Sequence, residues 1–212
     1  MDAKPYVVTI SHQLGSGGAY LGEKLAGRLC IPFLDREILK QVARQLDLAE
    51  NEVANREEHL SSFWQNFART AIMTDPTLSL AAQPYSPSDS DLFELECATI
   101  QKIAVKESAV FMGRCGWYVL RSHPRHVSIL VTAEHSARVK RLCELYQYSQ
   151  AAAEQEIRAN DHERADYIRT FTKQNWLDAR LYDLCVNTSA VGLDSTVDLA
   201  ENCVSQKLAR LG

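Results

Sequence analysis

The stretch YVVTISHQLGSGGAYLGEKLAGRL, from Tyr6 to Leu29, joins an apolar run, a glycine-rich turn and a helical apolar pattern. Residues 6–10 predict a buried strand and residues 20–29 a helix. Glycines between a strand and a helix let backbone N–H groups and the positive helix end surround a phosphate. We therefore expect a phosphate-binding loop formed by Gly15, Ser16, Gly17, Gly18, Ala19 and Tyr20. A sharp turn without a ligand is the alternative.

The loop departs from the G-x-x-x-x-G-K-[ST] pattern of phosphate loops. His12 stands at the first glycine and Gly17 matches the second. Gly18 replaces the lysine, and Ala19 replaces the serine or threonine that holds magnesium. Lys24 lies about one and a half turns into the helix and points away from the loop in ideal geometry. Charge and metal ligand are therefore both missing from this loop.

The rest of the chain alternates strands with helices, which predicts a doubly wound α/β domain with a parallel sheet. Further strands are expected at 31–34, 109–112, 127–132 and 184–186. Further helices are expected at 36–46, 92–106, 135–146, 151–169 with a break, and 196–211. A helical insertion at 50–73 and a proline- and serine-rich loop at 74–91 interrupt the alternation.

Composition narrows the class of protein. The 212 residues carry a net charge of -4, and the longest apolar runs are far below the roughly 20 residues that cross a bilayer. Residues 1–5, MDAKP, lack the apolar centre of a secretion signal, so we expect a cytoplasmic protein. The six cysteines contain no C-x-x-C pair, and neither disulfides nor a zinc site is expected.

Positive charge is concentrated in one part of this acidic chain. Nine of the fifteen arginines lie between Arg114 and Arg180. Such a local cluster suits a small, highly charged anion better than a nucleic acid or a membrane. A solvated helix face is the alternative for these side chains.

Six segments in order resemble the cytidylate kinase-like family of P-loop nucleoside monophosphate kinases. They are ISHQLGSGGAYLGEKLA (10–26), IPFLDREIL (31–39), VFMGRCGWYVL (110–120), RVKR (138–141), NDHERADYIR (160–169) and YDLCVNTS (182–189). The resemblance implies one P-loop NTPase domain over residues 1–212, with a five-stranded parallel sheet flanked by helices. It also implies a helical substrate-binding insertion at about 50–91, an arginine-bearing lid at about 149–171, and the use of ATP and Mg²⁺.

The resemblance also carries site residues. It implies that Gly113 and Arg114 meet the acceptor monophosphate, and that the nucleoside lies near Asp35, Arg36 and Asp161. Catalytic charge would come from Arg138, Arg141, Arg158 and Arg164. A structural ion pair is the alternative for Arg114, a helix N-cap for Asp35, and the orientation of an arginine for Asp161.

These features predict phosphoryl transfer from ATP to a nucleoside monophosphate, with cytidylate favoured by resemblance. A non-catalytic phosphate-binding protein and a kinase of another small alcohol are the alternatives. Because residues 149–171 are rich in alanine and charge, we expect this lid to pack loosely. The apolar helix at 92–105 also suggests pairing between subunits, so we expect a homodimer.

Overall fold

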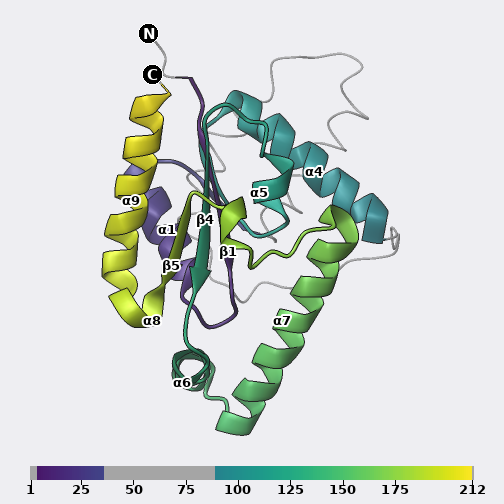
Figure 1. The fold of residues 1–212 in the computed structure, drawn as a ribbon, viewed down its shortest axis with the longest axis vertical. Helices are drawn as coiled ribbons and strands as arrows, with labels where there is room; N and C mark the ends of the chain where they lie inside the picture. The colour runs from purple at the N-terminus through teal and green to yellow at the C-terminus, as the bar shows by residue number, and fades with distance from the viewer. Residues whose placement is uncertain (1–3, 36–88, 212) are drawn as a thin grey trace, which may run out of the picture. The chain divides into compact units, whose positions relative to one another are not determined.

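The computed structural model describes residues 4–35 and 89–211 (Figure 1). The chain divides into two units, residues 1–36 with 100–212 and residues 37–99, and the sheet belongs to the first. All strand pairings are parallel, in the order β2-β3-β1-β4-β5. The strands are β1 Val7–His12, β2 Phe33–Leu34, β3 Ala109–Met112, β4 His126–Thr132 and β5 Leu184–Asn187. The predicted five-stranded parallel sheet is confirmed, and β1 lies at its centre between β3 and β4.

The helices agree with the sequence pattern in most places. They are α1 Gly18–Leu29, α4 Asp89–Lys106, α5 Gly116–Val119, α6 His135–Tyr146, α7 Gln150–Thr172, α8 Thr188–Val191, α9 Leu193–Arg210 and the 3₁₀ helix η1 Ala179–Leu181. The break expected within residues 151–169 is wrong, because α7 is continuous. The expected helices at 36–46 and 50–73 lie outside the described residues, as does the predicted loop up to residue 88; residues 89–91 begin α4.

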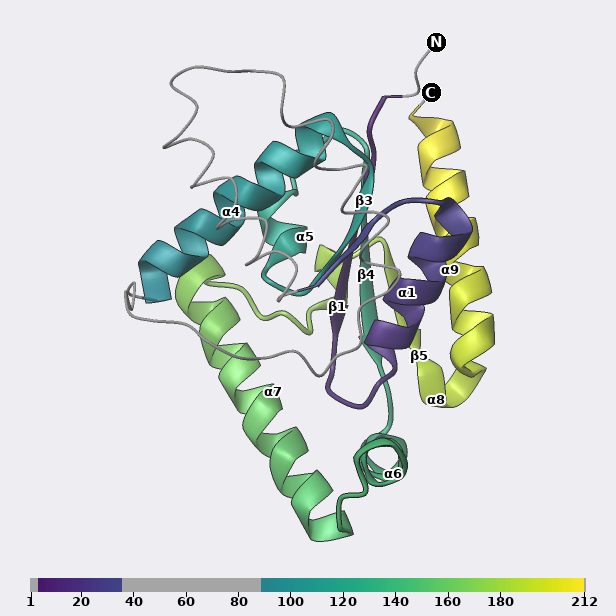
Figure 2. The same cartoon turned by 180° about the vertical axis from the view of Figure 1, so that it is seen from behind.

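One face of the sheet is covered by α1 and α9, which lie side by side (Figure 2). Alternate residues of β1, Val8 and Ile10, point to this face, as the two-residue period of a strand requires. They join a core cluster with Leu21 and Leu25 of α1 and Val197 of α9, all at most 1% exposed. This packing fixes the position of α1 relative to the end of β1.

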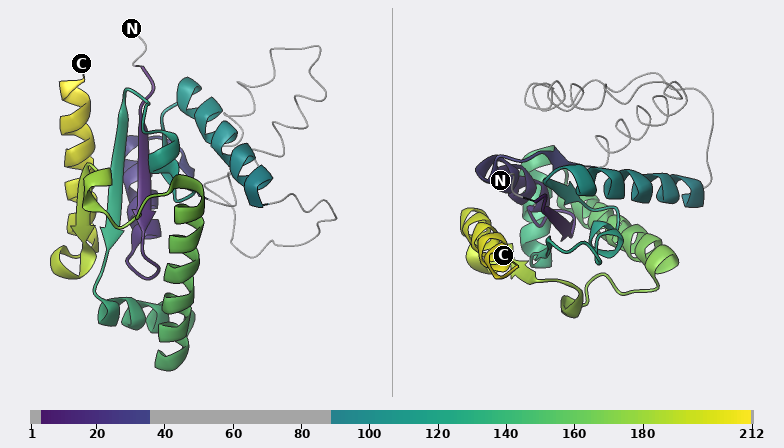
Figure 3. Two further views of the ribbon diagram at one scale, coloured as in Figure 1. Left: turned by 45° about the vertical axis from the view of Figure 1, so that its right-hand side comes forward. Right: turned by 90° about the horizontal axis from the view of Figure 1, so that it is seen from above.

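The carboxyl end of the sheet carries two further helices. Figure 3 shows α6 lying across the amino-terminal end of α7. Val139 and Leu142 of α6 pack there with Ala153 and Ile157 of α7, and Leu14 packs against them. The amino-terminal half of α7 is therefore packed on α6, while the expected loose packing of the lid on the sheet domain stays a prediction. Ile157 supplies the apolar contact. Within the described residues, no helix is long and apolar enough to cross a membrane.

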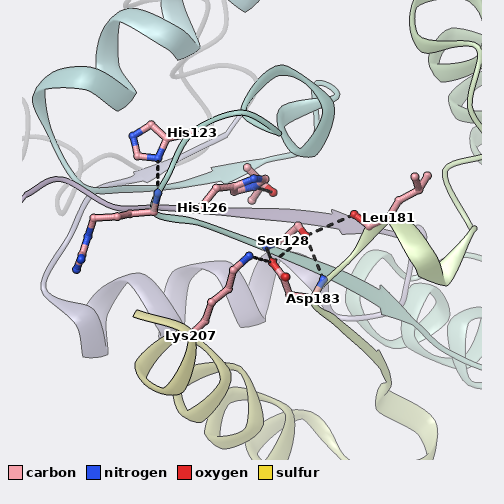
Figure 4. A network of polar contacts seen from close by, with 8 residues as sticks. His123, His126, Ser128, Leu181, Asp183 and Lys207 are labelled. Carbon is pink, nitrogen blue, oxygen red and sulfur yellow. Dashed lines mark hydrogen bonds and ion pairs between the residues drawn. The ribbon is translucent and has the colours of Figure 1, made fainter. Parts of the chain in front are cut away.

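A polar network ties β4 to β5 and α9 (Figure 4). Asp183 accepts hydrogen bonds from the Ser128 N–H (2.8 Å) and from Lys207 Nζ (2.6 Å), and its own N–H donates to the Ser128 carbonyl (2.9 Å). Burial raises the pKa of Asp183, but the bonds from Lys207 and Ser128 outweigh it and hold the pKa below the usual 3.8. The carboxylate is thus favoured in the folded state.

Asp183→Asn is expected to lower the free energy of unfolding by about 1–3 kcal/mol at pH 7, because Lys207 loses its partner. A lowered carboxyl pKa contributes stability above the unfolded-state pKa, and this stability is lost as the pH falls through and below 3.8. Urea unfolding between pH 3 and 7 should therefore show the difference between wild type and variant shrinking on acidification. Asp198→Asn, which breaks an exposed pair with Arg28, is the control and should stay within about 0.5 kcal/mol. Equal losses in both variants would contradict this role of Asp183.

Candidate phosphate-binding site

The glycine-rich loop follows the end of β1 and opens α1. Gly15 and Gly17 have φ of 79° and 87°, in the left-handed region that favours glycine. A Cβ at Gly15 would lie 2.7 Å from Leu142 Cδ1 and 2.9 Å from the Arg138 carbonyl oxygen, both on α6. Both backbone conformation and space therefore require glycine at this position.

The first turn of α1 presents free backbone donors. Its N-cap is Gly17, which has no side chain to accept a hydrogen bond from the first turn. The first backbone hydrogen bond of the helix is donated by Leu21 N to Gly17 O. The N–H groups of residues 18–20 therefore find no acceptor in the described part of the chain, as at any uncapped helix start. Ser16 is different: its N–H donates to Gln13 O (3.0 Å) and its Oγ to Val131 O (3.2 Å). The amides of Gly18, Ala19 and Tyr20 are left to hold an anion.

Three side chains from other elements donate hydrogen bonds to backbone carbonyls of the loop. Arg138 Nε donates to Leu14 O (2.7 Å), and Arg141 Nη1 donates to Gly15 O (2.8 Å). Thr188 Oγ1, at the end of β5, donates to Ser16 O (2.7 Å). Each of these bonds uses a carbonyl, so none of them occupies the free amides of residues 18–20. Sequence reasoning missed the contact of Thr188 because it is 172 residues from Ser16 along the chain.

Arg138 also links the two helices at the carboxyl end of the sheet. Its Nη1 and Nη2 donate to the two carboxylate oxygens of Asp161, each at 2.8 Å. The Arg138 side chain is only 4% exposed. Such a bidentate pair fixes the orientation of both groups. Asp161 therefore orients an arginine beside the loop, one of the two roles considered for it.

Arg164 lies on α7 with its guanidinium over the Trp176 ring, 5.5 Å from the ring centroid. Its Nη1 is buried and has no hydrogen-bond partner among the residues that the structure describes. Burial lowers the pKa of Arg164, Asp161 partly opposes this and Arg138 adds to it, and the guanidinium stays charged at neutral pH. Leaving a charged donor buried and unsatisfied is costly. This position fits an anionic ligand that accepts from Nη1.

Arg158 occupies a different face of the same helix. Its side chain is 68% exposed and its Nη1 lies 3.9 Å from Glu154, one turn earlier. Exposed pairs of this kind contribute little to stability. The structure thus brings Arg138, Arg141 and Arg164 towards the loop but leaves Arg158 in solvent.

The segment after β3 has an unusual backbone. Gly113, Arg114 and Cys115 have φ of 70°, 51° and 53°, three left-handed residues in succession. Non-glycine residues held in this region cost about 1–3 kcal/mol each and cluster at functional sites. The Arg114 guanidinium lies 5.7 Å from the centroid of the Tyr167 ring on α7. Arg114 therefore stands where β3 ends, beside α7, as expected for a ligand-binding position of an open sheet.

His12, the last residue of β1, fills the space next to Gly18. A Cβ at Gly18 would overlap Cβ and Cγ of His12 and lie 3.0 Å from its Cδ2. Residue 18 therefore has no room for a side chain while His12 is present. Burial lowers the pKa of His12 to about 3, with further lowering by Arg164 and Arg138, so the imidazole is neutral. Its Nδ1 is buried without a hydrogen-bond partner in the described ranges 4–35 and 89–211.

The expected nucleoside-binding pair is only partly placed. Asp35 directly follows β2, at the carboxyl end of the sheet. Arg36 and the helix that Asp35 was predicted to cap lie outside the described residues. The two interpretations of Asp35, nucleoside ligand and N-cap, therefore both stay predictions.

Comparisons with known proteins agree with this fold. The fold is similar to that of an uncharacterized protein from Eubacterium ventriosum, with 22% identity and a TM-score of 0.71. The match covers 94% of this chain and 98% of that one. The fold is also similar to that of a gluconokinase from Sinorhizobium meliloti, with 14% identity and a TM-score of 0.51. This match covers 98% of this chain and 95% of that one. No curated protein matches the chain. The model of the cytidylate kinase-like family matches residues 7–190, which include the loop, Arg114 and the arginines of α6 and α7. The chain therefore belongs to the cytidylate kinase-like family.

Proposed function

We propose that this protein transfers a phosphoryl group from ATP to a nucleoside monophosphate, with cytidylate as the favoured acceptor. The observation that supports it best is the position of Arg164. Its buried, unpartnered Nη1 belongs to a cluster in which Arg138 and Arg141 bond to the glycine-rich loop itself. Within the described residues, Asp161 is the one carboxylate that forms an ion pair with any of these arginines, and it pairs with Arg138, so the cluster carries excess positive charge. That excess matches a polyphosphate.

The arrangement suits phosphoryl transfer because this reaction needs positioning and charge more than covalent participation. In the proposed complex, the amides of residues 18–20 hold the donor phosphates at the positive end of α1. Arg164 meets the charge that develops on the transferred group. Arg114, at the end of β3, holds the acceptor phosphate.

Magnesium fits the site less well than phosphate does. The loop hydroxyl, Ser16 Oγ, donates to the Val131 carbonyl, and Ala19 replaces the usual hydroxyl residue. Asp161 is engaged by Arg138 through both oxygens. We therefore assign no residue of the loop to Mg²⁺. A metal that enters as the complex with ATP would keep phosphate and water as its ligands, as Mg²⁺ commonly does.

A coupled assay with MgATP and each common nucleoside monophosphate tests the proposal directly. Turnover with at least one monophosphate, and the highest kcat/KM with cytidylate, is the expected result. The absence of turnover with every acceptor would refute the kinase proposal.

A non-catalytic phosphate-binding protein is the second candidate, because Gly18 removes the loop lysine and Ala19 the hydroxyl. Calorimetric titration with ATP separates this candidate from a loop that binds nothing. Binding of ATP without turnover of any nucleoside monophosphate, or of another small alcohol such as gluconate, would favour this candidate over a kinase.

Ala19→Arg is expected to tighten ATP binding by roughly tenfold, since a charge-assisted hydrogen bond contributes about 1.5–3 kcal/mol. Ala19 is exposed in the first turn of α1, so an arginine has room there and lies beside the free amides. Calorimetry on wild type and variant measures the change. Ala19→Gln, of similar length without charge, is the control. Equal affinities for the arginine and glutamine variants would show that no cationic gap exists at this position.

A further inference from the structure

His12 is a polar residue of the site that the proposed function leaves without a role. Its imidazole packs against Gly18, the first residue of α1, whose amide is one of the free donors of the loop. It therefore lies beside the place where a phosphate would bind. Its Nδ1 is buried, and no described residue forms a hydrogen bond with that atom.

Two charged side chains from two elements act on His12. Arg164 of α7 and Arg138 of α6 act on it, and both disfavour the imidazolium. Asp161 of α7 is paired with Arg138. The residue opposite His12 on β4 is Val131, which is apolar, and Gly18 of α1 carries no side chain. Without an anion, the surroundings therefore keep His12 neutral.

We propose that His12 supplies the positive charge of the missing loop lysine, by taking up a proton when a polyphosphate binds to the loop. This inference rests on the proposed function, because it requires that the loop binds polyphosphate. The steric contact supports it: a side chain at position 18 would begin in the space that Cβ and Cγ of His12 already fill, so the chain carries His12 and no side chain at that position.

The magnitudes allow such a change. At an effective dielectric constant of about 20, one opposite unit charge about 4 Å away favours the imidazolium by roughly a thousandfold. A rise of the His12 pKa from about 3 to near 7 corresponds to a roughly ten-thousandfold change in the proton affinity of the imidazole. Two phosphate charges near the ring are therefore enough. The same charges also bind Arg138 and Arg164, which weakens the repulsion that these arginines exert on His12.

NMR of the histidine side chains tests the proposal on the full chain, with inorganic tripolyphosphate as the probe. The ¹⁵N and ¹³C shifts of His12, assigned from the peaks missing in His12→Gln, report its protonation at pH 6.5. We expect a neutral ring in the free protein and an imidazolium at saturation. His126, which bonds to Thr9 Oγ1 in the sheet, is the internal control and should stay neutral in both states.

Calorimetry in buffers of different ionisation enthalpy gives a second readout. Wild type should take up close to one proton more per bound tripolyphosphate than His12→Gln does. If the probe binds and His12 stays neutral, this inference is overturned while the proposed function stands. If the probe does not bind at all, both are overturned.

Discussion

Arg164→Ala is expected to lower turnover about a hundredfold while raising KM for ATP much less. The guanidinium is fixed over Trp176 with Nη1 buried and unsatisfied by any described residue, so it is already oriented for an acceptor. A preoriented donor that meets charge developing in the transition state contributes about 10²–10³ in kcat. Because such a contact strengthens in the transition state, its loss lowers kcat more than ground-state binding.

Two variants of the same helix make this measurement specific. Arg169→Ala removes an exposed arginine of the last turn of α7, and its turnover should stay within about twofold of wild type. Arg164→Lys keeps the charge but loses the guanidinium that lies over the Trp176 ring, so we expect an intermediate turnover. Steady-state kinetics and melting temperature are measured on the same preparations. If turnover of Arg164→Ala falls only in proportion to a lower melting temperature, the role of Arg164 is structural.

Arg158→Ala tests whether α7 moves as a lid. In this structure its side chain lies in solvent near Glu154, and it reaches the loop only if α7 moves. The lid hypothesis from the sequence predicts at least a tenfold loss of turnover in Arg158→Ala, with stability nearly unchanged. The packing of Ala153 and Ile157 on α6 favours a smaller loss, because this half of α7 is anchored. Wild-type turnover in Arg158→Ala would remove Arg158 from the mechanism.

The sequence predicted the sheet well because each strand is a short, nearly continuous apolar run. Ala109–Met112 was predicted to the residue, and β1 and β4 within two residues at each end. The helix α5 was missed because its four residues, GWYV, have too little length for a helical period. It is fixed by tertiary contact instead: a Cβ at Gly116 would lie 3.2 Å from Thr9 Cγ2 of β1.

The residues of the candidate site could be predicted from the sequence, but the contacts between them could not. The glycines and arginines could be found because charge and glycine clustering are visible along the chain. The bond from Thr188 to Ser16 and the contact of Arg164 with the Trp176 ring join residues from different elements of the fold, and no sequence spacing predicts them. His12 was noticed at the sequence level only as a substitution. That it fills the space of residue 18 follows from the backbone path of β1 into α1.

The contact between His12 and Gly18 leads to the largest expected change in stability. Gly18→Lys should lower the free energy of unfolding by about 3 kcal/mol, because its Cβ would overlap Cβ and Cγ of His12, atoms close to the backbone that cannot swing away. In a chain of this length the melting temperature should fall by roughly 6–12 °C. Gly27→Lys is the matched control on the same helix, since no atom lies within 4 Å of a Cβ there. Lysine is the better helix former, so Gly27→Lys should be neutral or slightly stabilising.

Removing the imidazole should reverse the loss. His12→Gly opens the space that residue 18 lacks, so the double variant His12→Gly, Gly18→Lys should regain at least about 2 kcal/mol relative to the sum of the single changes, measured as a double-mutant cycle. The double variant also has the glycine and lysine of the G-x-x-x-x-G-K pattern. Its lysine should tighten ATP binding by roughly tenfold or more over His12→Gly alone, as a charge-assisted contact provides. Additive losses in the cycle would mean that Gly18 is required by something other than His12. Restored stability without tighter ATP binding would mean that the donor phosphates do not lie beside residue 18.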